Sequence, residues 1–121
     1  MNENPSSGKP LAGQTPDGQF TYRQNGVGRM TVELGTNFTH EDWDPFSSFV
    51  RNQINAGIVH WFLDLRKLQL LNSLLIGAII GMNMVVQSNR GSLHLIVTRD
   101  SRISQLINMS KINRIIPMDE M

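Results

Sequence analysis

The sequence predicts one α/β domain, in which helices pack on a mixed β-sheet of four to five strands. Two segments with strand patterns come first, and helical and strand patterns alternate from residue 39 onward. Such alternation calls for right-handed crossover connections within a single sheet. The length of 121 residues and the hydrophobic content of 40% suit one domain with one modest core.

The first 19 residues differ in composition from the rest of the chain. They are rich in Pro, Gly and Ser and contain one leucine. Such a segment buries too little apolar surface to offset the entropy lost on ordering, and its polar start does not match a signal peptide. We therefore predict a disordered N-terminal tail over residues 1–19 and a folded domain over residues 20–121.

A β-hairpin followed by a helix is predicted at the start of the domain. Residues 20–25 and 29–34 alternate as strands do, and the glycines between them suit a turn. Thr39 is a candidate N-cap, since acidic side chains follow it where a helix dipole favours negative charge. The helix is expected to end at Gly57. Its apolar face, at three- and four-residue steps, consists of Trp43, Phe46, Phe49, Val50 and Ile54.

The remaining elements alternate between strand and helix. Residues 58–65 form an almost continuous apolar run, which predicts a strand buried on both faces. Residues 73–88 predict a helix that is apolar almost all round, and residues 92–98 predict the next core strand. A shorter helix is expected to end at residue 109. The last apolar stretch, INRIIPM, predicts an edge strand that Pro117 stops.

Charge and cysteine content argue against several classes of function. The net charge of +1, from 11 basic and 10 acidic side chains, gives no basic stripe for nucleic acid. The absence of cysteine excludes thiolate metal sites and suits a reducing compartment, so we expect a cytoplasmic protein. His40, His60 and His94 lack metal-ligand spacing, and no nucleotide-binding or nucleophile motif is present. We expect a protein without metal or cofactor that is not an enzyme.

One uncharged run has the length of a membrane span. Residues 68–86 carry no charged side chain, and basic residues flank them. Gln69, Asn72, Ser73 and Asn83 lie inside the run and would be costly in lipid. The strand patterns on both sides favour a helix of a folded domain, without membrane insertion.

Three motifs in the second half of the chain follow a recognisable order. Leu63-Asp64-Leu65 ends a strand, Asn72-Ser73-Leu74-Leu75-Ile76-Gly77 begins a helix, and the Gly-led strand RGSLHLIV precedes a closing stretch from Ile107 to Pro117. In order and spacing these motifs resemble the STAS domain, the fold of bacterial anti-sigma factor antagonists and of the cytoplasmic tails of some anion transporters. The resemblance covers roughly residues 20–118 and is strongest over residues 58–118.

The resemblance implies regulation through protein binding. In the antagonist members, an anti-sigma factor that is itself a kinase phosphorylates the serine after the helix cap, and the unphosphorylated form binds that kinase. By position, this serine corresponds to Ser73. The chain departs from the family at four positions: Asn72 replaces Asp, Leu74 replaces Ser or Thr, and Leu75 and Lys111 each replace Gly.

The start of the helix over residues 73–88 also stands out on physical grounds. A helix N-terminus offers unpaired N–H groups and a partial positive charge, so a phosphate is well placed there. A phosphoserine adds about −1.5 to −2 charges. The alternative is that Asn72 or Ser73 simply caps the helix.

The same helix has more apolar surface than packing on a sheet requires. Leu74, Gly77, Gly81 and Met84 fall on one stripe, and its two glycines would allow another backbone to approach closely. An exposed apolar stripe would be a contact surface. The alternative, that the glycines face the sheet and the whole helix is buried, stays open at this point.

The sequence thus predicts a regulatory module that binds a switch-type serine kinase, an anti-sigma factor or a related regulator. The predicted contact residues are Asn72, Ser73, Leu74, Gly77, Gly81 and Met84. The alternative is a constitutive STAS subunit of a transporter or signalling assembly without phosphorylation, and a homodimer through the same surface is also open. Asp64 lies at a strand end, where α/β folds place ligand groups, but a local cap on the following loop is the preferred interpretation.

Overall fold

The computed structural model describes residues 12–14 and 19–121. The elements in chain order are β1 (Ala12–Gln14), β2 (Phe20–Gly26), β3 (Arg29–Leu34), η2 (His40–Asp42), α1 (Trp43–Asn55), β4 (His60–Asp64), α2 (Ser73–Ser88), β5 (Ser92–Val97), α3 (Arg102–Ser110), η3 (Ile112–Arg114) and β6 (Met118–Glu120). Most of the predicted tail lies outside the described residues. This order confirms the predicted α/β class.

The six strands form one sheet in the order in which they occur in the sequence. The pairs β1–β2 and β2–β3 are antiparallel, whereas β3 to β6 are parallel neighbours. The sheet is larger than predicted partly because Ala12–Gln14 pairs with Thr21–Arg23. This edge pairing uses backbone hydrogen bonds, so the polar composition of the segment could not reveal it.

The end of the chain differs from the predicted edge strand. The segment INR forms the 3-10 turn η3, in which the N–H groups of Ile115 and Ile116 donate to the carbonyl of Ile112. The strand β6 begins only after Pro117, whose carbonyl accepts a hydrogen bond from the N–H of Leu95 at 2.9 Å. Pro117 therefore precedes the edge strand rather than stopping it, since a proline lacks only the donor and still accepts.

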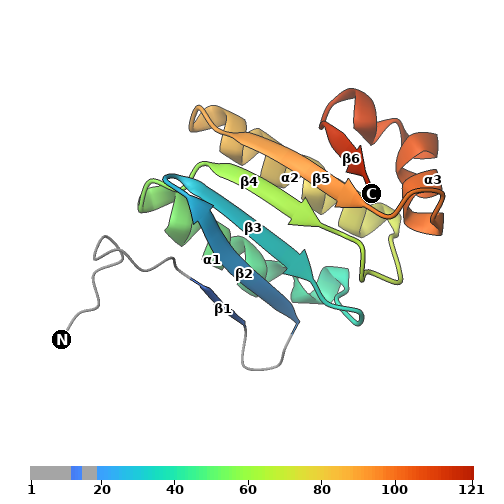
Figure 1. Cartoon of the computed structure of the whole chain (residues 1–121), viewed down its shortest axis with the longest axis horizontal. Coiled ribbons are helices and arrows are strands. Elements are labelled where there is room, and N and C mark those ends of the chain that lie inside the picture. Colours follow the sequence, from blue (N-terminus) through green and yellow to red (C-terminus); the bar gives the residue numbers. More distant parts are fainter. Residues whose placement is uncertain (1–11, 15–18) are drawn as a thin grey trace.

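Both long helices cover the same face of the sheet. In Figure 1, α1 and α2 lie side by side behind the strands, and α3 lies at the β6 end. The strand residues that face these helices are fully buried, as Met30, Val32 and Leu34 of β3 show. They join the buried residues of all three helices in one hydrophobic core.

Among residues 12–14 and 19–121, no helix covers the opposite face of the sheet, which corrects the prediction for β4. Trp61 and Leu63 are buried in the core, but His60 and Phe62 on the other face are only half-buried. The neighbouring strand repeats this pattern, since Ile96 is half-buried and does not pack on the core. The strand β4 is central and parallel to both neighbours, as predicted, but it is buried on one face because the helices gather on one side.

Candidate functional site

Asn72 supplies the cap at the start of α2. Its Oδ1 accepts a hydrogen bond from the N–H of Leu75 at 2.9 Å, with the Asn72 backbone in an extended conformation. Its Nδ2 lies 3.4 Å from His40 Nδ1 and donates to it in the tautomer that leaves this nitrogen unprotonated. The cap therefore ties the start of α2 to the turn η2 that precedes α1.

Ser73 is the first residue of α2 and is exposed. None of the hydrogen bonds among the described residues involves its hydroxyl. Of the two residues that could cap the helix, Asn72 has the capping role, and the Ser73 hydroxyl stays accessible to solvent.

The apolar side of α2 that faces away from the sheet consists of Leu74, Gly77, Gly81 and Met84, and it is named here the outer face of α2. Leu74 is 62% exposed and Met84 is 66% exposed. A Cβ added at Gly77 or Gly81 would meet no atom within 4 Å. The glycines therefore point away from the sheet, and the stripe predicted from the sequence lies on the surface. The opposite side of the helix packs in the core through Leu75, Ile79, Met82 and Val86.

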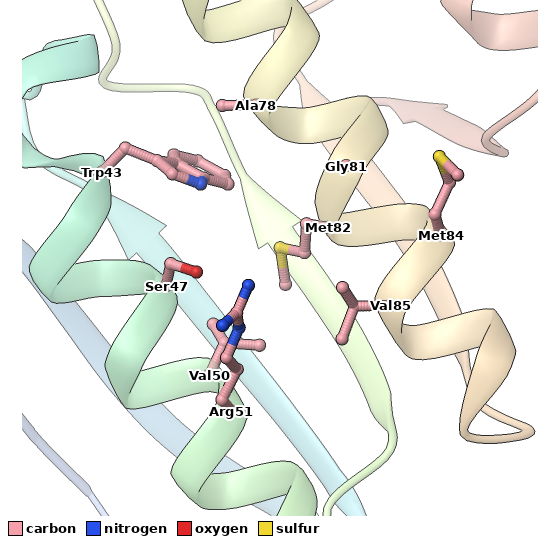
Figure 2. Close-up of a pocket in the computed structure, with 9 residues that line it drawn as sticks. All are labelled: Trp43, Ser47, Val50, Arg51, Ala78, Gly81, Met82, Met84 and Val85. Carbon is pink, nitrogen blue, oxygen red and sulfur yellow. The ribbon is translucent and has the colours of Figure 1, made fainter.

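A groove of about 390 Å³ runs between α1 and α2 beside this outer face. Figure 2 shows the α1 side chains on one side of it and those of α2 on the other. Its lining residues are Trp43, Ser47, Val50, Arg51, Ala78, Gly81, Met82, Met84 and Val85. Sequence reasoning did not predict the α1 part, because only the packing of the two helices places Trp43 and Arg51 beside Gly81.

The charge beside α2 comes from neighbouring elements, such as Arg51 of α1, which lines the groove. The helix α2 itself has no charged residue along its whole length. Beside its start, η2 is capped by Thr39, whose N–H donates to Asp42 Oδ2 at 2.8 Å. This confirms Thr39 as an N-cap and gives Asp42 a local role, since the two residues form a reciprocal capping box.

Asp64 takes part in a local interaction with the following loop. Asp64 is 3% exposed, and its carboxylate accepts hydrogen bonds from the backbone N–H, Nε and Nη2 of Arg66 at 2.8–3.2 Å. Hydrogen bonding to this carboxylate, followed by its charge, raises the pKa of Arg66 above its ordinary value. This arrangement supports the local interpretation of Asp64 over that of a ligand group.

The three histidines contact different neighbours. His60 Nδ1 lies 2.9 Å from Ser92 Oγ, and His94 stacks on Phe62 with ring centroids 5.3 Å apart. Within residues 12–14 and 19–121, no group of three or more metal-ligating side chains comes together. In the same part of the chain, no helix combines the length and hydropathy needed to span a membrane.

The sheet order, the parallel strands β3 to β6 and the capped helix α2 define a STAS-like fold. The NMR structure of the protein TM1081 superposes with a TM-score of 0.70 at 16% identity, covering 81% of this chain and 78% of that one. A crystal structure of the same Thermotoga maritima protein, described as a candidate anti-sigma factor antagonist, gives a TM-score of 0.61 at 16% identity, covering 93% and 86%. No protein-family model and no curated protein matches the sequence. At this identity the likeness shows the fold.

Proposed function

We propose that this chain is a non-enzymatic regulatory module of the cytoplasm, similar in kind to an anti-sigma factor antagonist. It binds a protein partner, a switch-type serine kinase or anti-sigma factor, through the start and the outer face of α2. The observation that carries the proposal is the position of Ser73. Its hydroxyl is exposed, does not cap the helix and lies at the edge of the outer face of α2.

Phosphorylation of Ser73 would act through the environment of that hydroxyl. The N-terminus of α2 favours an added negative charge, so the modified chain stays folded. A phosphate of about −1.5 to −2 charges would lie beside Leu74 at the edge of an uncharged surface. A partner that covers this surface would have to desolvate the phosphate, which is unfavourable unless the partner pairs it. Phosphorylation is therefore expected to release the partner.

The test compares the wild-type chain, Ser73→Ala and Ser73→Asp as baits in lysate of the source organism, with mass spectrometry of the retained proteins. The proposal expects one serine kinase to be retained by the wild type and by Ser73→Ala and lost with Ser73→Asp. Ser48→Asp is the matched control, because Ser48 is exposed on α1 and does not line the groove. This control should retain the kinase.

A second outcome would support a different function. If all four baits retain the same partner equally, Ser73 is not a switch and the chain is a constitutive subunit of a transporter or signalling assembly. The uncharged outer face of α2 suits such a permanent contact equally well, since its apolar side chains would then be covered at all times. Retention of no partner by the wild type would contradict both functions.

A further inference from the structure

The outer face of α2 has a symmetry that the proposed function does not use. In chain order its residues are large, small, small and large: Leu74, Gly77, Gly81 and Met84. At 100° per residue, all four lie within about 40° of the direction opposite the buried Ile79. The pattern reads the same in both directions from a point level with Ile79. Such a face fits a copy of itself across a two-fold axis.

We propose that the outer face of α2 packs antiparallel against the same face of a second copy of this chain. A two-fold axis level with Ile79 would place Gly77 opposite Gly81 of the second copy, and Leu74 opposite its Met84. The glycines leave open space at the centre, so the helix backbones can approach closely there. The exposed Leu74 and Met84 side chains would cover each other at the two ends of the contact.

Charge permits this arrangement. A two-fold contact brings identical surfaces together, so a charged face would repel itself unless both signs were suitably placed. The helix α2 carries no charged residue, so no like charges meet between the two copies of α2 themselves. Antiparallel packing also places the positive N-terminal end of each helix beside the negative C-terminal end of the other.

The contact is small compared with the interface of a stable dimer. A helix of 16 residues is about 24 Å long, and one face of such a helix buries less than the roughly 1,200–2,000 Å² of a stable interface. The dimer should therefore be reversible and should form with rising concentration. It uses the surface that the proposed function assigns to a protein partner, so dimerisation and partner binding exclude each other. Formation of the dimer does not depend on whether a kinase or another protein binds this chain.

Cysteine cross-linking tests the proposed register directly, because the chain contains no cysteine of its own. Leu74 and Met84 are about 15 Å apart along the helix, whereas a disulfide requires Cα atoms about 4.4–6.8 Å apart. An antiparallel dimer therefore predicts that Leu74→Cys alone and Met84→Cys alone do not cross-link under mild oxidation. An equimolar mixture of the two variants should form a covalent dimer.

Met109→Cys is the matched control for random collision, since Met109 on α3 is 77% exposed. The proposal is supported if the mixture yields more covalent dimer than Met109→Cys does, while each single variant yields only as much as Met109→Cys. If Leu74→Cys alone or Met84→Cys alone yields more covalent dimer than Met109→Cys, the helices pack in parallel and the proposal is wrong. The proposal is also wrong if the mixture yields no more covalent dimer than Met109→Cys. The assay contains only this chain, so its result is independent of whether a partner kinase exists.

Sedimentation velocity gives a second measurement without oxidation. The sedimentation coefficient of the wild-type chain should rise with protein concentration. Met84→Glu, which would place a carboxylate against Leu74 of the second copy, should abolish the rise, and Met109→Glu should preserve it. A wild-type coefficient that stays constant at the monomer value up to the highest soluble concentration would contradict the proposal.

Discussion

At the scale of single residues, the division of roles between Asn72 and Ser73 decides what the site can do. The amide side chain of Asn72 satisfies the N–H of Leu75, so the serine beside it is not needed to hold the helix start. Lys111 shows a similar local effect at the end of α3. Its φ of 64° lies in the left-handed region that favours glycine, which is the residue found there in the family that the sequence resembles.

The first prediction follows from this division. Asn72→Ala removes the side-chain acceptor at the N-cap and should lower the free energy of unfolding by about 1 kcal/mol. Ser73→Ala alters an exposed side chain that makes no hydrogen bond with the described residues, so it should change the free energy of unfolding by less than about 0.5 kcal/mol. Urea unfolding of the purified variants measures both values.

Asn72→Asp is the control for the cap. It keeps an acceptor oxygen and adds a negative charge at the helix N-terminus, so its stability should stay near that of the wild type. If Ser73→Ala were as destabilising as Asn72→Ala, the serine would contribute to the helix start, and its availability as a switch would be lost.

At the scale of elements, α2 combines a packed side with an exposed apolar side. Ile79 is 1% exposed, and the glycines on the opposite side face open space. Glycine is unfavourable within a helix because it has the most backbone freedom to lose on folding. The two glycines therefore make the helix less stable, while the open space beside them would allow the close approach of another surface that we propose.

The second prediction concerns these glycines. Gly77→Ala and Gly81→Ala should each raise the free energy of unfolding by about 0.5–1 kcal/mol, since the added Cβ has space and alanine favours the helix. The same variants should weaken any association through the outer face of α2. Chemical denaturation measures the first effect, and sedimentation velocity measures the second.

Gly91→Ala is the contrasting control, because a Cβ at Gly91 would collide with the backbone carbonyl of Val59. This variant should be less stable than the wild type. Destabilisation by Gly77→Ala of a similar size would mean that the glycines of α2 are packed against other atoms, and the outer face would then not be free.

At the scale of the whole molecule, α1 and α2 both lie on one face of the sheet, and no helix in the described part of the chain covers the other face. Parallel sheets are usually covered on both faces, yet here four consecutive strands, β3 to β6, are parallel with Phe62 and Ile96 only half-buried. Adjacent residues of one strand lie on opposite faces of the sheet, so the residue under the helices should contribute more to the free energy of unfolding than its neighbour.

The third prediction compares two such neighbours on β5. Leu95 is completely buried on the helix-covered face, so Leu95→Ala should lower the free energy of unfolding by about 2–5 kcal/mol. Ile96→Ala on the uncovered face should lower it by about 1 kcal/mol. Thermal or urea unfolding distinguishes the two values. Equal losses would show that Ile96 is also packed, and that a further part of the protein covers this face.

Several parts of the structure follow from local sequence patterns. The bounds predicted for α2, residues 73–88, agree with the observed helix, because a capping residue and a long apolar run define both of its ends. The hairpin β2–β3 and the N-cap at Thr39 were also predicted, since turns and caps depend on residues close together in sequence. In each case the determining interactions span only a few residues.

Other features depend on contacts between distant segments, and local patterns missed them. The strand β1 exists because its backbone pairs with β2, and β6 begins after Pro117 because it pairs with β5. Phe62 is half-exposed because the helices pack on the other face of the sheet. An apolar run in the sequence does not show whether helices cover one face of its strand or both. The groove beside α2 likewise arises only where two helices meet.

By itself, the sequence determined the order of the elements from β2 to α3, a cap at Asn72 or Ser73, and the alignment of Leu74, Gly77, Gly81 and Met84 on one side of a helix. These features depend on helix geometry and on hydrogen bonds between near neighbours. Only the tertiary structure decided that this side faces outward, because it could equally have faced the sheet. Burial explains this orientation, since the side of α2 with Ile79 and the larger apolar surface packs on the sheet, and the glycine side faces outward.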